Sequence, residues 1–310
     1  MSSRPFRFGV QKHQSSDGPS FVAAAKRIEE LGYDTLQVMD HFGDQLAPIS
    51  AMTAAAAATT GLRVGSLVLD NDYRHPLVLA KELATLDLLS DGRVEAGIGA
   101  GWMTSDYEES GIQHDPARVR VDRLEEALAV IKGLWGDGAV THEGEHYRIT
   151  GHDGTPKPIQ RPHPPILIGG GGPRVLSIAA READIVGINT NMKAGTMASG
   201  AADATADAVE SKVARVRETA GDRFDALELH VMSFAVMVTD DRDGTSEMVA
   251  GMLGLTPADL ADSPYVLIGT TGQIADDLRS DRDRWGISYY SVMADSVEAF
   301  APVVAELSGS

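Results

Sequence analysis

The sequence predicts an α/β fold, a (β/α)8 or TIM barrel with insertions, in a single domain over residues 1–310. Short apolar runs alternate with helical patterns along the chain, which is typical of parallel strands joined by crossover helices. About eight such strand–helix units occupy 310 residues, and no break in composition divides the chain into two domains. These two observations favour a closed barrel over an open doubly wound sheet.

The expected strands are apolar runs bounded by turn residues, and they cover 6–10, 33–39, 62–69, 94–98, 165–168, 184–188, 227–239 and 287–292. Helical spacing predicts helices over 21–31, 49–59, 77–89, 119–135, 207–220 and 273–285, with others within 246–260 and ending at 182 and 307. Ser20 is the expected N-cap of the first helix, and Gly32 its end. Insertions are expected near 136–164, 189–206 and 240–266, the first containing a small hairpin.

The overall composition of the chain excludes several classes of partner and of site. The chain has 45 acidic and 27 basic residues, a formal charge of −18, which argues against nucleic acid or an anionic membrane as the partner. It has no cysteine, which excludes disulfides, a thiolate nucleophile and a thiolate metal site. Residues 1–7 lack the apolar core of a signal peptide and no run is long enough to span a membrane, so we expect a soluble, cytoplasmic protein.

A glycine-spaced loop ends the fourth expected strand. Gly97, Gly99 and Gly101 alternate there, and Trp102 follows directly. Such glycines leave bare backbone against which a flat ligand can lie, with Trp102 as a wall; the alternative is a tight turn without a ligand. The pattern is not a Rossmann fingerprint, because the last two glycines are too close together and no acidic residue follows at the required place.

Polar residues follow two earlier strands. In a barrel, the residues after each strand share one face, where sites are built. Asp40 and His41 follow the second strand. His41 can exchange a proton near neutral pH; alternatively, Asp40 caps the loop and His41 bonds to the backbone. Asp70 and Asn71 follow the third strand and offer acceptors and an amide, although this pair is also common in turns.

Glycines 169–172 run into a helix after the fifth strand. Free N–H groups at a helix N-terminus form an anion site, to which Arg174 can add charge; alternatively, the run is a flexible turn with a helix cap. It is not a Walker P-loop, because no Gly-Lys-Ser/Thr follows. Histidines in and near the first insertion have irregular spacings, so we expect surface residues and no metal site: His142, His146, His152 and His163.

Taken together, the strand rhythm and these loops resemble the luciferase-like flavin and deazaflavin oxidoreductase superfamily over nearly the whole chain. The motifs that carry the resemblance are 40–42 (Asp-His-Phe), 65–69, 74–76, 83–87, 90–93, 97–102 and 168–174. Asp-His-Phe and the run 68–76 are most similar to the branch that uses coenzyme F420, which is common in actinobacteria. An alanine-rich, lysine-poor composition fits such a source.

The resemblance implies an oxidoreductase that transfers a hydride between C5 of F420 and a small organic substrate. His41 and Asp40 would be the catalytic residues, with His41 transferring the proton and Asp40 contacting the ring. A non-proline cis peptide bond at Leu67–Val68 would bulge behind the ring. The implied cofactor contacts are Asp40, Leu67, Val68, Asn71, Ala100, Gly101 and Trp102 around the ring, and Gly170, Gly171, Gly172 and Arg174 at the phosphate.

The chain also departs from the family pattern. Some members carry an acid where this chain has Trp102, so we expect no general acid there and a mechanism that depends on His41 or on the substrate. The loop 189–200 contains one basic residue, Lys193, which argues against a sugar phosphate and favours an uncharged substrate. A homodimer is expected, and the composition of the loop 189–206 permits a lid.

Other functions stay open. One is an FMNH2-dependent two-component monooxygenase of the same fold, which would receive reduced FMN from a separate reductase. Another is a barrel that binds a flavin or a phosphate ligand without turnover. A lyase or isomerase is least favoured, because no lysine at a strand end indicates Schiff-base chemistry.

Overall fold

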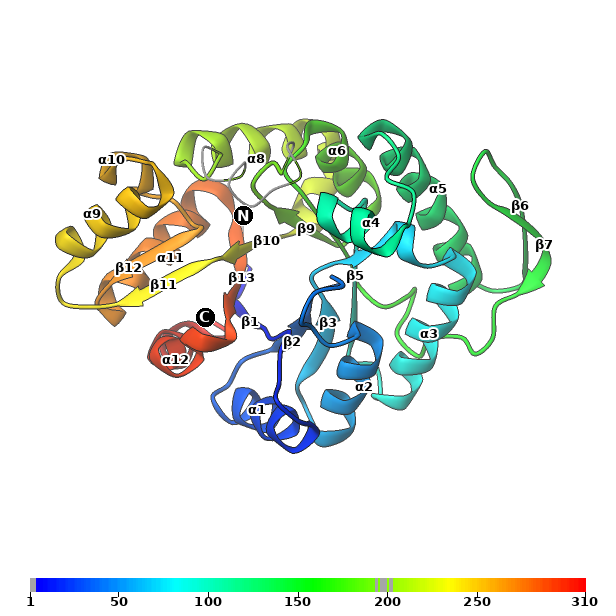
Figure 1. Cartoon of the computed structure of the whole chain (residues 1–310), viewed down its shortest axis with the longest axis horizontal. Coiled ribbons are helices and arrows are strands. Elements are labelled where there is room, and N and C mark those ends of the chain that lie inside the picture. The colour runs from blue at the N-terminus through cyan, green and yellow to red at the C-terminus, as the bar shows by residue number, and fades with distance from the viewer. Residues whose placement is uncertain (1–3, 193–194, 196–199, 201–202) are drawn as a thin grey trace.

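The computed structural model describes residues 4–192, 195, 200 and 203–310. Over these residues, eight parallel strands close into a barrel, which confirms the predicted fold class (Figure 1). Each strand pairs with the next, and the last pairs with the first. In this order they are β1 (Arg7–Gln11), β2 (Thr35–Val38), β3 (Arg63–Ser66), β5 (Val94–Gly99), β8 (Ile166–Gly170), β9 (Ile185–Ile188), β10 (Glu228–Ser233) and β13 (Ile287–Met293).

Helices surround the barrel on its outside (Figure 1). The first differs from expectation: its N-cap is Asp17 and not Ser20, because the Asp17 carboxylate accepts a hydrogen bond of 2.7 Å from the backbone N–H of Ser20. The others begin and end within about two residues of the expected bounds. The helices are α1 (Gly18–Glu30), α2 (Pro48–Ala58), α3 (Pro76–Leu89), α5 (Ala117–Trp135), α6 (Pro173–Glu182), α8 (Ala206–Ala220), α11 (Thr271–Trp285) and α12 (Val297–Leu307), with 3-10 turns η2 (Gly221–Ala226) and η3 (Ala294–Ser296).

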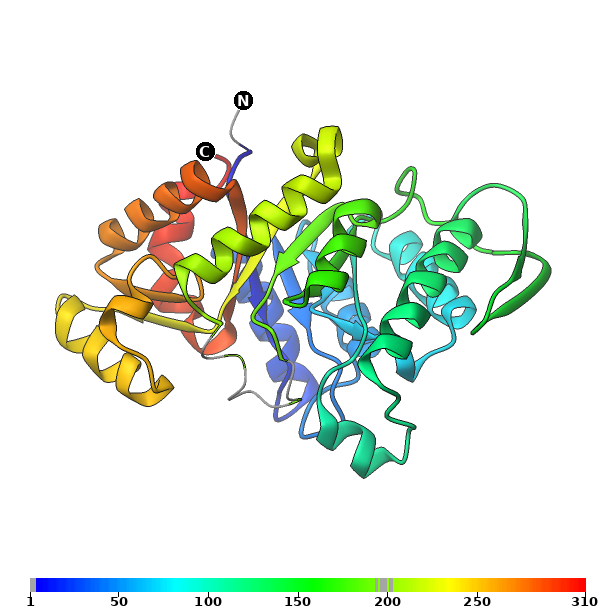
Figure 2. The same ribbon diagram turned by 90° about the horizontal axis from the view of Figure 1, so that it is seen from above.

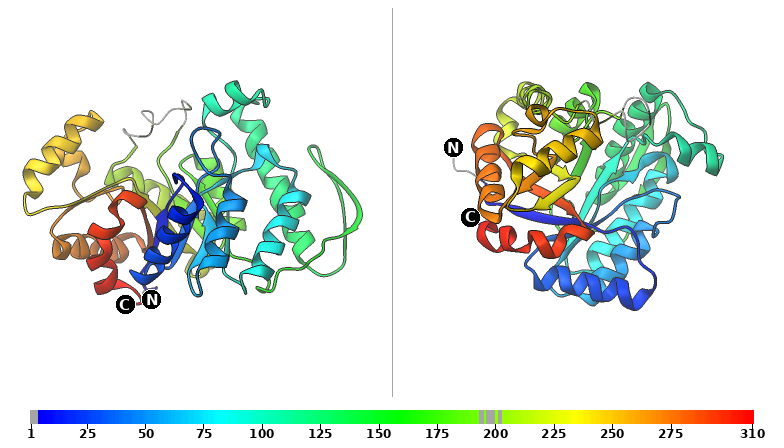
Figure 3. Two further views of the ribbon diagram at one scale, coloured as in Figure 1. Left: turned by 60° about the horizontal axis from the view of Figure 1, so that its bottom comes forward. Right: turned by 60° about the vertical axis from the view of Figure 1, so that its left-hand side comes forward.

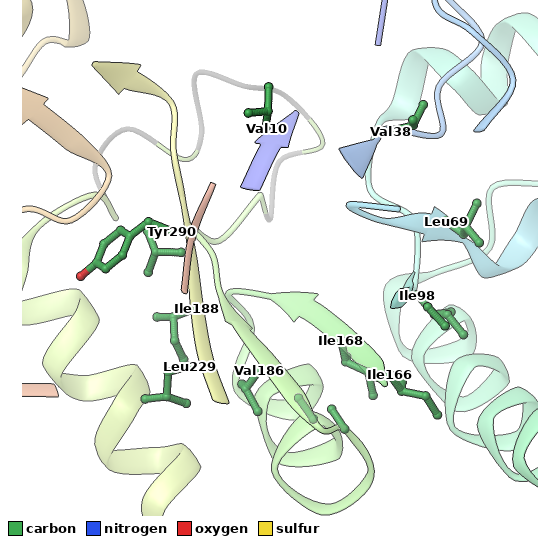
Figure 4. Close-up of a cluster of buried hydrophobic side chains, with 14 of the residues drawn as sticks. Val10, Val38, Leu69, Ile98, Ile166, Ile168, Val186, Ile188, Leu229 and Tyr290 are labelled. Atoms are coloured by element: carbon green, nitrogen blue, oxygen red, sulfur yellow. The ribbon is translucent and has the colours of Figure 1, made fainter. Parts of the chain in front are cut away.

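Alternation along the strands separates two layers of side chains. Apolar residues such as Val10, Ile98 and Ile168 are fully buried and belong to the main hydrophobic core, and Figure 4 shows part of this core. The barrel interior is packed with both polar and apolar side chains: Gln37 Nε2 donates to the Tyr289 hydroxyl at 3.1 Å, and Leu167 and Ile185 belong to a small apolar cluster with Tyr289. A filled interior restricts any ligand to the barrel mouth.

The first insertion forms the expected hairpin. β6 (Ala139–Glu143) and β7 (Arg148–Asp153) pair antiparallel outside the barrel. Figures 1 and 2 show this hairpin at one end of the long axis of the molecule.

The expected strand over 227–239 is wrong in its second half. β10 ends at Ser233, and the N–H of Phe234 donates to the carbonyl oxygen of Tyr265 at 2.9 Å. The chain therefore leaves the barrel, and β11 (Ala235–Val238) pairs in parallel with β12 (Val266–Gly269), which was not expected as a strand. This excursion starts before the expected 240–266 and carries α9 (Arg242–Leu253) and α10 (Pro257–Leu260) at the other end of the molecule (Figures 1 and 2).

Short elements surround the carboxyl ends of the strands. They are β4 (Leu69–Asp70), η1 (Asn71–Tyr73) and α4 (Thr104–Ser110), and the left view of Figure 3 shows α4 on this side. α4 was not expected, because its seven residues show no apolar periodicity. The loop 189–206, whose composition permits a lid, lies partly outside the described residues.

The two ends of the described chain are adjacent: the N–H of Phe6 donates to the carbonyl oxygen of Ser310 at 3.2 Å. Among the helices described, none has the length and apolar character to cross a membrane.

Candidate active site

The carboxyl ends of the strands carry most of the candidate residues. His41 follows β2, and Trp102 follows β5 in the loop that leads to α4. The structure brings these two together: their ring centroids are 5.6 Å apart and their planes are nearly perpendicular. It also adds Asp106 of α4, which the sequence analysis did not select.

The His41 imidazole is held by a buried carboxylate. Its Nδ1 lies 2.6 Å from Oδ2 of Asp106, whose side chain is 6 % exposed. The same oxygen accepts a hydrogen bond of 3.1 Å from the Tyr73 hydroxyl. Thus, although position 102 holds no acid, α4 places one against the candidate proton-transfer residue.

Asp40 is buried and both of its oxygens are engaged. It forms an ion pair with Arg74, whose Nη2 lies 3.0 Å from Oδ1, and Oδ2 accepts a 3.0 Å hydrogen bond from the N–H of Asp70. These contacts fix the turn that follows β4. What the structure shows for Asp40 is therefore a role in holding the loops of the mouth.

Asp70 lies beneath the glycine loop. Burial raises the pKa of Asp70 to about 7, and the neighbouring Asp72 carboxylate adds to the rise. The Tyr107 hydroxyl lies 3.0 Å from an oxygen of each of these carboxylates. Gly101 has a φ of +70°, and a Cβ there would overlap both the Tyr107 hydroxyl and the Asp70 carboxylate.

The Leu67–Val68 peptide bond is cis, as the family resemblance implied. Leu67 packs with Leu167 in a small apolar cluster inside the barrel, and Val68 packs against that cluster. A Cβ on Gly97 would overlap the carbonyl oxygen of Ser66, and one on Gly99 would lie 2.6 Å from Cγ2 of Val68. The expectation that these two glycines leave bare backbone for a ligand is therefore wrong, because the segment 66–68 fills the space.

The glycine run before α6 is only partly open. A Cβ on Gly171 would collide with the backbone of residues 189–191, whereas Gly172 has open space beside it. Pro173, the first residue of α6, has no N–H, so the N–H groups of Arg174 and Val175 are the first two of that helix. The Arg174 guanidinium does not lie over the glycines; it pairs with Asp122 of α5.

Three further residues, of which Asn71 and Ala100 were predicted, fall in different surroundings. Asn189 Oδ1, at the end of β9, is buried without a hydrogen-bond partner among the described residues. Asn71 donates from Nδ2 to the Tyr147 hydroxyl at 3.1 Å, which ties it to the hairpin insertion. Ala100 is half-buried and packs against the main core.

His13 is a second residue that sequence reasoning missed, although it follows the first strand and the same rule would select it. Its Nδ1 is buried and has no hydrogen-bond partner among the described residues. Burial lowers the pKa of His13, and the charge of the adjacent Lys12 adds to the effect.

The arginines around the mouth are already paired with carboxylates. Arg74 pairs with Asp40, Arg123 with Asp72 at 2.6 Å, and Arg174 with Asp122. Within the described ranges, no group of three or more His, Cys, Asp or Glu side chains could hold a metal ion. Of the histidines expected at the surface, His142 pairs with Glu126 at 3.0 Å.

Comparison with known proteins places these observations in a family. A family model described as luciferase-like monooxygenase matches residues 1–289. An F420-dependent glucose-6-phosphate dehydrogenase of Amycolatopsis mediterranei is 32 % identical over 190 residues, which cover 57 % of this chain and 56 % of that enzyme. The enzyme of the same name from Nakamurella multipartita is 32 % identical over 255 residues, covering 78 % and 71 %. An FMNH2-dependent dimethylsulfone monooxygenase of Pseudomonas putida is 32 % identical over 158 residues, covering 50 % and 42 %.

The fold is shared more widely. The coenzyme F420-dependent tetrahydromethanopterin reductase of Methanopyrus kandleri superposes with a TM-score of 0.76 at 18 % identity, over 98 % of both chains. At this identity, the likeness shows the fold alone.

Proposed function

The chain belongs to the luciferase-like monooxygenase family, and from this premise we propose that it is an F420-dependent oxidoreductase. It transfers a hydride between C5 of the deazaflavin and a carbon of a small, uncharged organic substrate. The observation that carries the proposal is the His41 imidazole, held by Asp106 at 2.6 Å beside Trp102 at the barrel mouth. Two relatives that match over 190 and 255 residues are enzymes that use F420.

The residues at the mouth fit this cofactor. The apolar Leu67 and Val68 and the Ala100–Gly101 backbone offer a surface for a flat ring, and the unpartnered Asn189 Oδ1 offers an acceptor. The open space beside Gly172 and the first N–H groups of α6 offer an anion site. In this proposal Arg174 contributes its backbone N–H rather than its guanidinium.

When bound, F420 supplies a two-electron hydride donor or acceptor, and no oxygen atom is inserted. The chain exchanges the proton: it accepts one when an alcohol is oxidised and returns one when a carbonyl is reduced. With Nδ1 against the Asp106 carboxylate, His41 uses Nε2, which has no hydrogen-bond partner among the described residues, to exchange a proton with a substrate heteroatom. Trp102 packs edge-on against His41. Asp40 and Arg74 keep the adjoining loops in place.

The pairing of three arginines at the mouth supports an uncharged substrate. A substrate phosphate needs cations that are free to bind it, but Arg74, Arg123 and Arg174 are occupied by carboxylates.

A two-component FMNH2-dependent monooxygenase is the second candidate, favoured by the 32 % identity to the dimethylsulfone monooxygenase. It would require a separate reductase to supply reduced FMN. A barrel that binds a flavin without turnover is the third.

The proposal is tested with purified protein, reduced F420 and a panel of neutral ketones, aldehydes and enones, and in the reverse direction with oxidised F420, alcohols and glucose 6-phosphate. We expect turnover with neutral compounds and none with the sugar phosphate. Turnover with glucose 6-phosphate would contradict the substrate class. Oxygen-dependent product formation with FMNH2 would instead support the monooxygenase.

A further inference from the structure

Asp106 joins three segments of the mouth through one carboxylate. Oδ2 contacts Nδ1 of His41 at 2.6 Å and the Tyr73 hydroxyl at 3.1 Å, and Oδ1 accepts from the N–H of Phe42 at 3.4 Å. Asp106 itself is 5 % exposed. These contacts come from the loop after β2, from η1 and from α4, which are far apart in the sequence.

Tyr73 is a fixed donor in this arrangement. Its ring packs against Phe42 at a tilt of 35°, with centroids 4.5 Å apart, and meets Tyr107 edge-on at 5.8 Å. Burial raises the pKa of Tyr73, and the Asp70 and Asp106 charges raise it further, so the hydroxyl keeps its proton. The Tyr73 hydroxyl therefore donates to Oδ2, and an ionised carboxylate can only accept from its other neighbours.

We propose that Asp106 is a positioning residue that holds His41 as the Nδ1–H tautomer and makes Nε2 the nitrogen that exchanges the proton. The catalytic part of this inference rests on the proposed function of His41; the tautomer itself does not. An imidazole whose Nδ1 faces an acceptor must place its hydrogen there, and its lone pair is then on Nε2. With an amide in place of the carboxylate, an N–H group can face Nδ1 and favour the opposite tautomer.

The first test is the nitrogen NMR spectrum of the full-length protein with ¹⁵N-labelled histidine, with and without F420. The His41 signals are assigned by their loss in His41→Asn. We expect a pyrrole-type Nδ1 and a pyridine-type Nε2 in the wild type, and a shift of population toward Nε2–H in Asp106→Asn. Glu109→Gln is the matched control, because it removes an exposed charge from the same helix, and it should leave the His41 signals unchanged. A wild-type Nε2–H tautomer would overturn the inference by itself, even if the Asp106 variant failed to fold.

The second test separates the inference from the proposed function. We expect Asp106→Asn to lower kcat by about 10²–10⁴ while KM and the Kd for F420 stay within about twofold, because binding contacts are untouched. Asp106→Glu should recover part of the lost kcat. An active wild type with an equally active, tautomer-shifted Asp106→Asn would overturn the catalytic role of Asp106. A wild type that binds F420 but turns over nothing would overturn the proposed function, and the NMR spectrum would still decide the tautomer.

Discussion

Gly99 of β5 leaves the space that the side chain of Val68 fills. A Cβ at position 99 would lie 2.6 Å from Cγ2 of Val68, well inside van der Waals contact. The glycines at positions 97 and 99 are thus explained by the packing of β5 against the segment 66–68.

We expect Gly99→Ala to lower the free energy of unfolding by about 1–3 kcal/mol through overpacking. Val68→Ala in the same chain should recover part of this loss, because it removes the methyl group that the new Cβ meets. Urea denaturation measures both. Gly272→Ala is the control: it has open space in the first turn of α11 and should be neutral or stabilising. If the effects of Gly99→Ala and Val68→Ala on the free energy of unfolding simply added, the predicted contact between these two positions would be contradicted.

Replacing His41 should greatly reduce turnover and leave the affinity for F420 unchanged. We expect His41→Asn to reduce kcat by about 10²–10⁴, the usual contribution of a positioned general acid or base. Steady-state kinetics and a separate F420 titration check the two quantities. His152→Asn, at an exposed position of the hairpin, should leave both unchanged. Activity and F420 affinity that fall together in His41→Asn would show a binding role instead.

Arg174 should contribute little through its side chain, because Asp122 holds the guanidinium on α5. We expect Arg174→Gln to change the Kd for F420 by less than about twofold, measured by fluorescence titration. Arg118→Gln controls for the lost charge, because Arg118 is an exposed arginine of α5 on the same face as Asp122. A tenfold weakening specific to Arg174→Gln, about 1.4 kcal/mol, would place the guanidinium on the phosphate.

Asp281 of α11 should make stability depend on pH. Burial raises the pKa of Asp281 to about 8, with Asp277 and Asp262 adding to the rise, and the Tyr290 hydroxyl donates to it at 3.1 Å. The folded protein therefore keeps this proton between about pH 4 and pH 8, where the unfolded chain has lost it, so stability falls as the pH rises through that window.

We expect Asp281→Asn to remove this loss and to raise the free energy of unfolding at pH 9 by about 2–5 kcal/mol, with little effect at pH 4. Urea midpoints at pH 4, 7 and 9 measure it. The exposed Asp283→Asn on the same helix should show no such pH dependence. If Asp281→Asn raised the free energy of unfolding equally at pH 4 and pH 9, the cause would be better packing and not the ionisation of Asp281.

The barrel was predictable from the sequence because its evidence is local. Each barrel strand is an apolar run next to a turn signal, and residues such as Val94 and Ile168 are buried as those runs indicated. β12 was missed because it pairs only with β11, outside the barrel, so its position depends on a distant segment.

The site was less predictable because its contacts are not local. His41 could be selected from its place after β2, but Asp106 lies 65 residues further along the chain, on a helix without apolar periodicity. The carboxylate partner of Arg174 is likewise 52 residues away, and no spacing rule links the two. Only the fold shows which charges neutralise each other.

The measurement that tests the central claim most directly is a parallel titration of the purified protein with F420 and with FMN. Tryptophan fluorescence provides the readout. Trp135 and Trp285 are 1 % exposed, whereas Trp102 is at the mouth, so Trp102→Phe should abolish most of the signal change. We predict micromolar binding of F420 and binding of FMN about a hundredfold weaker, a difference of about 2.7 kcal/mol. Tighter binding of FMN would contradict the account and favour the monooxygenase, and binding of neither would overturn both functions.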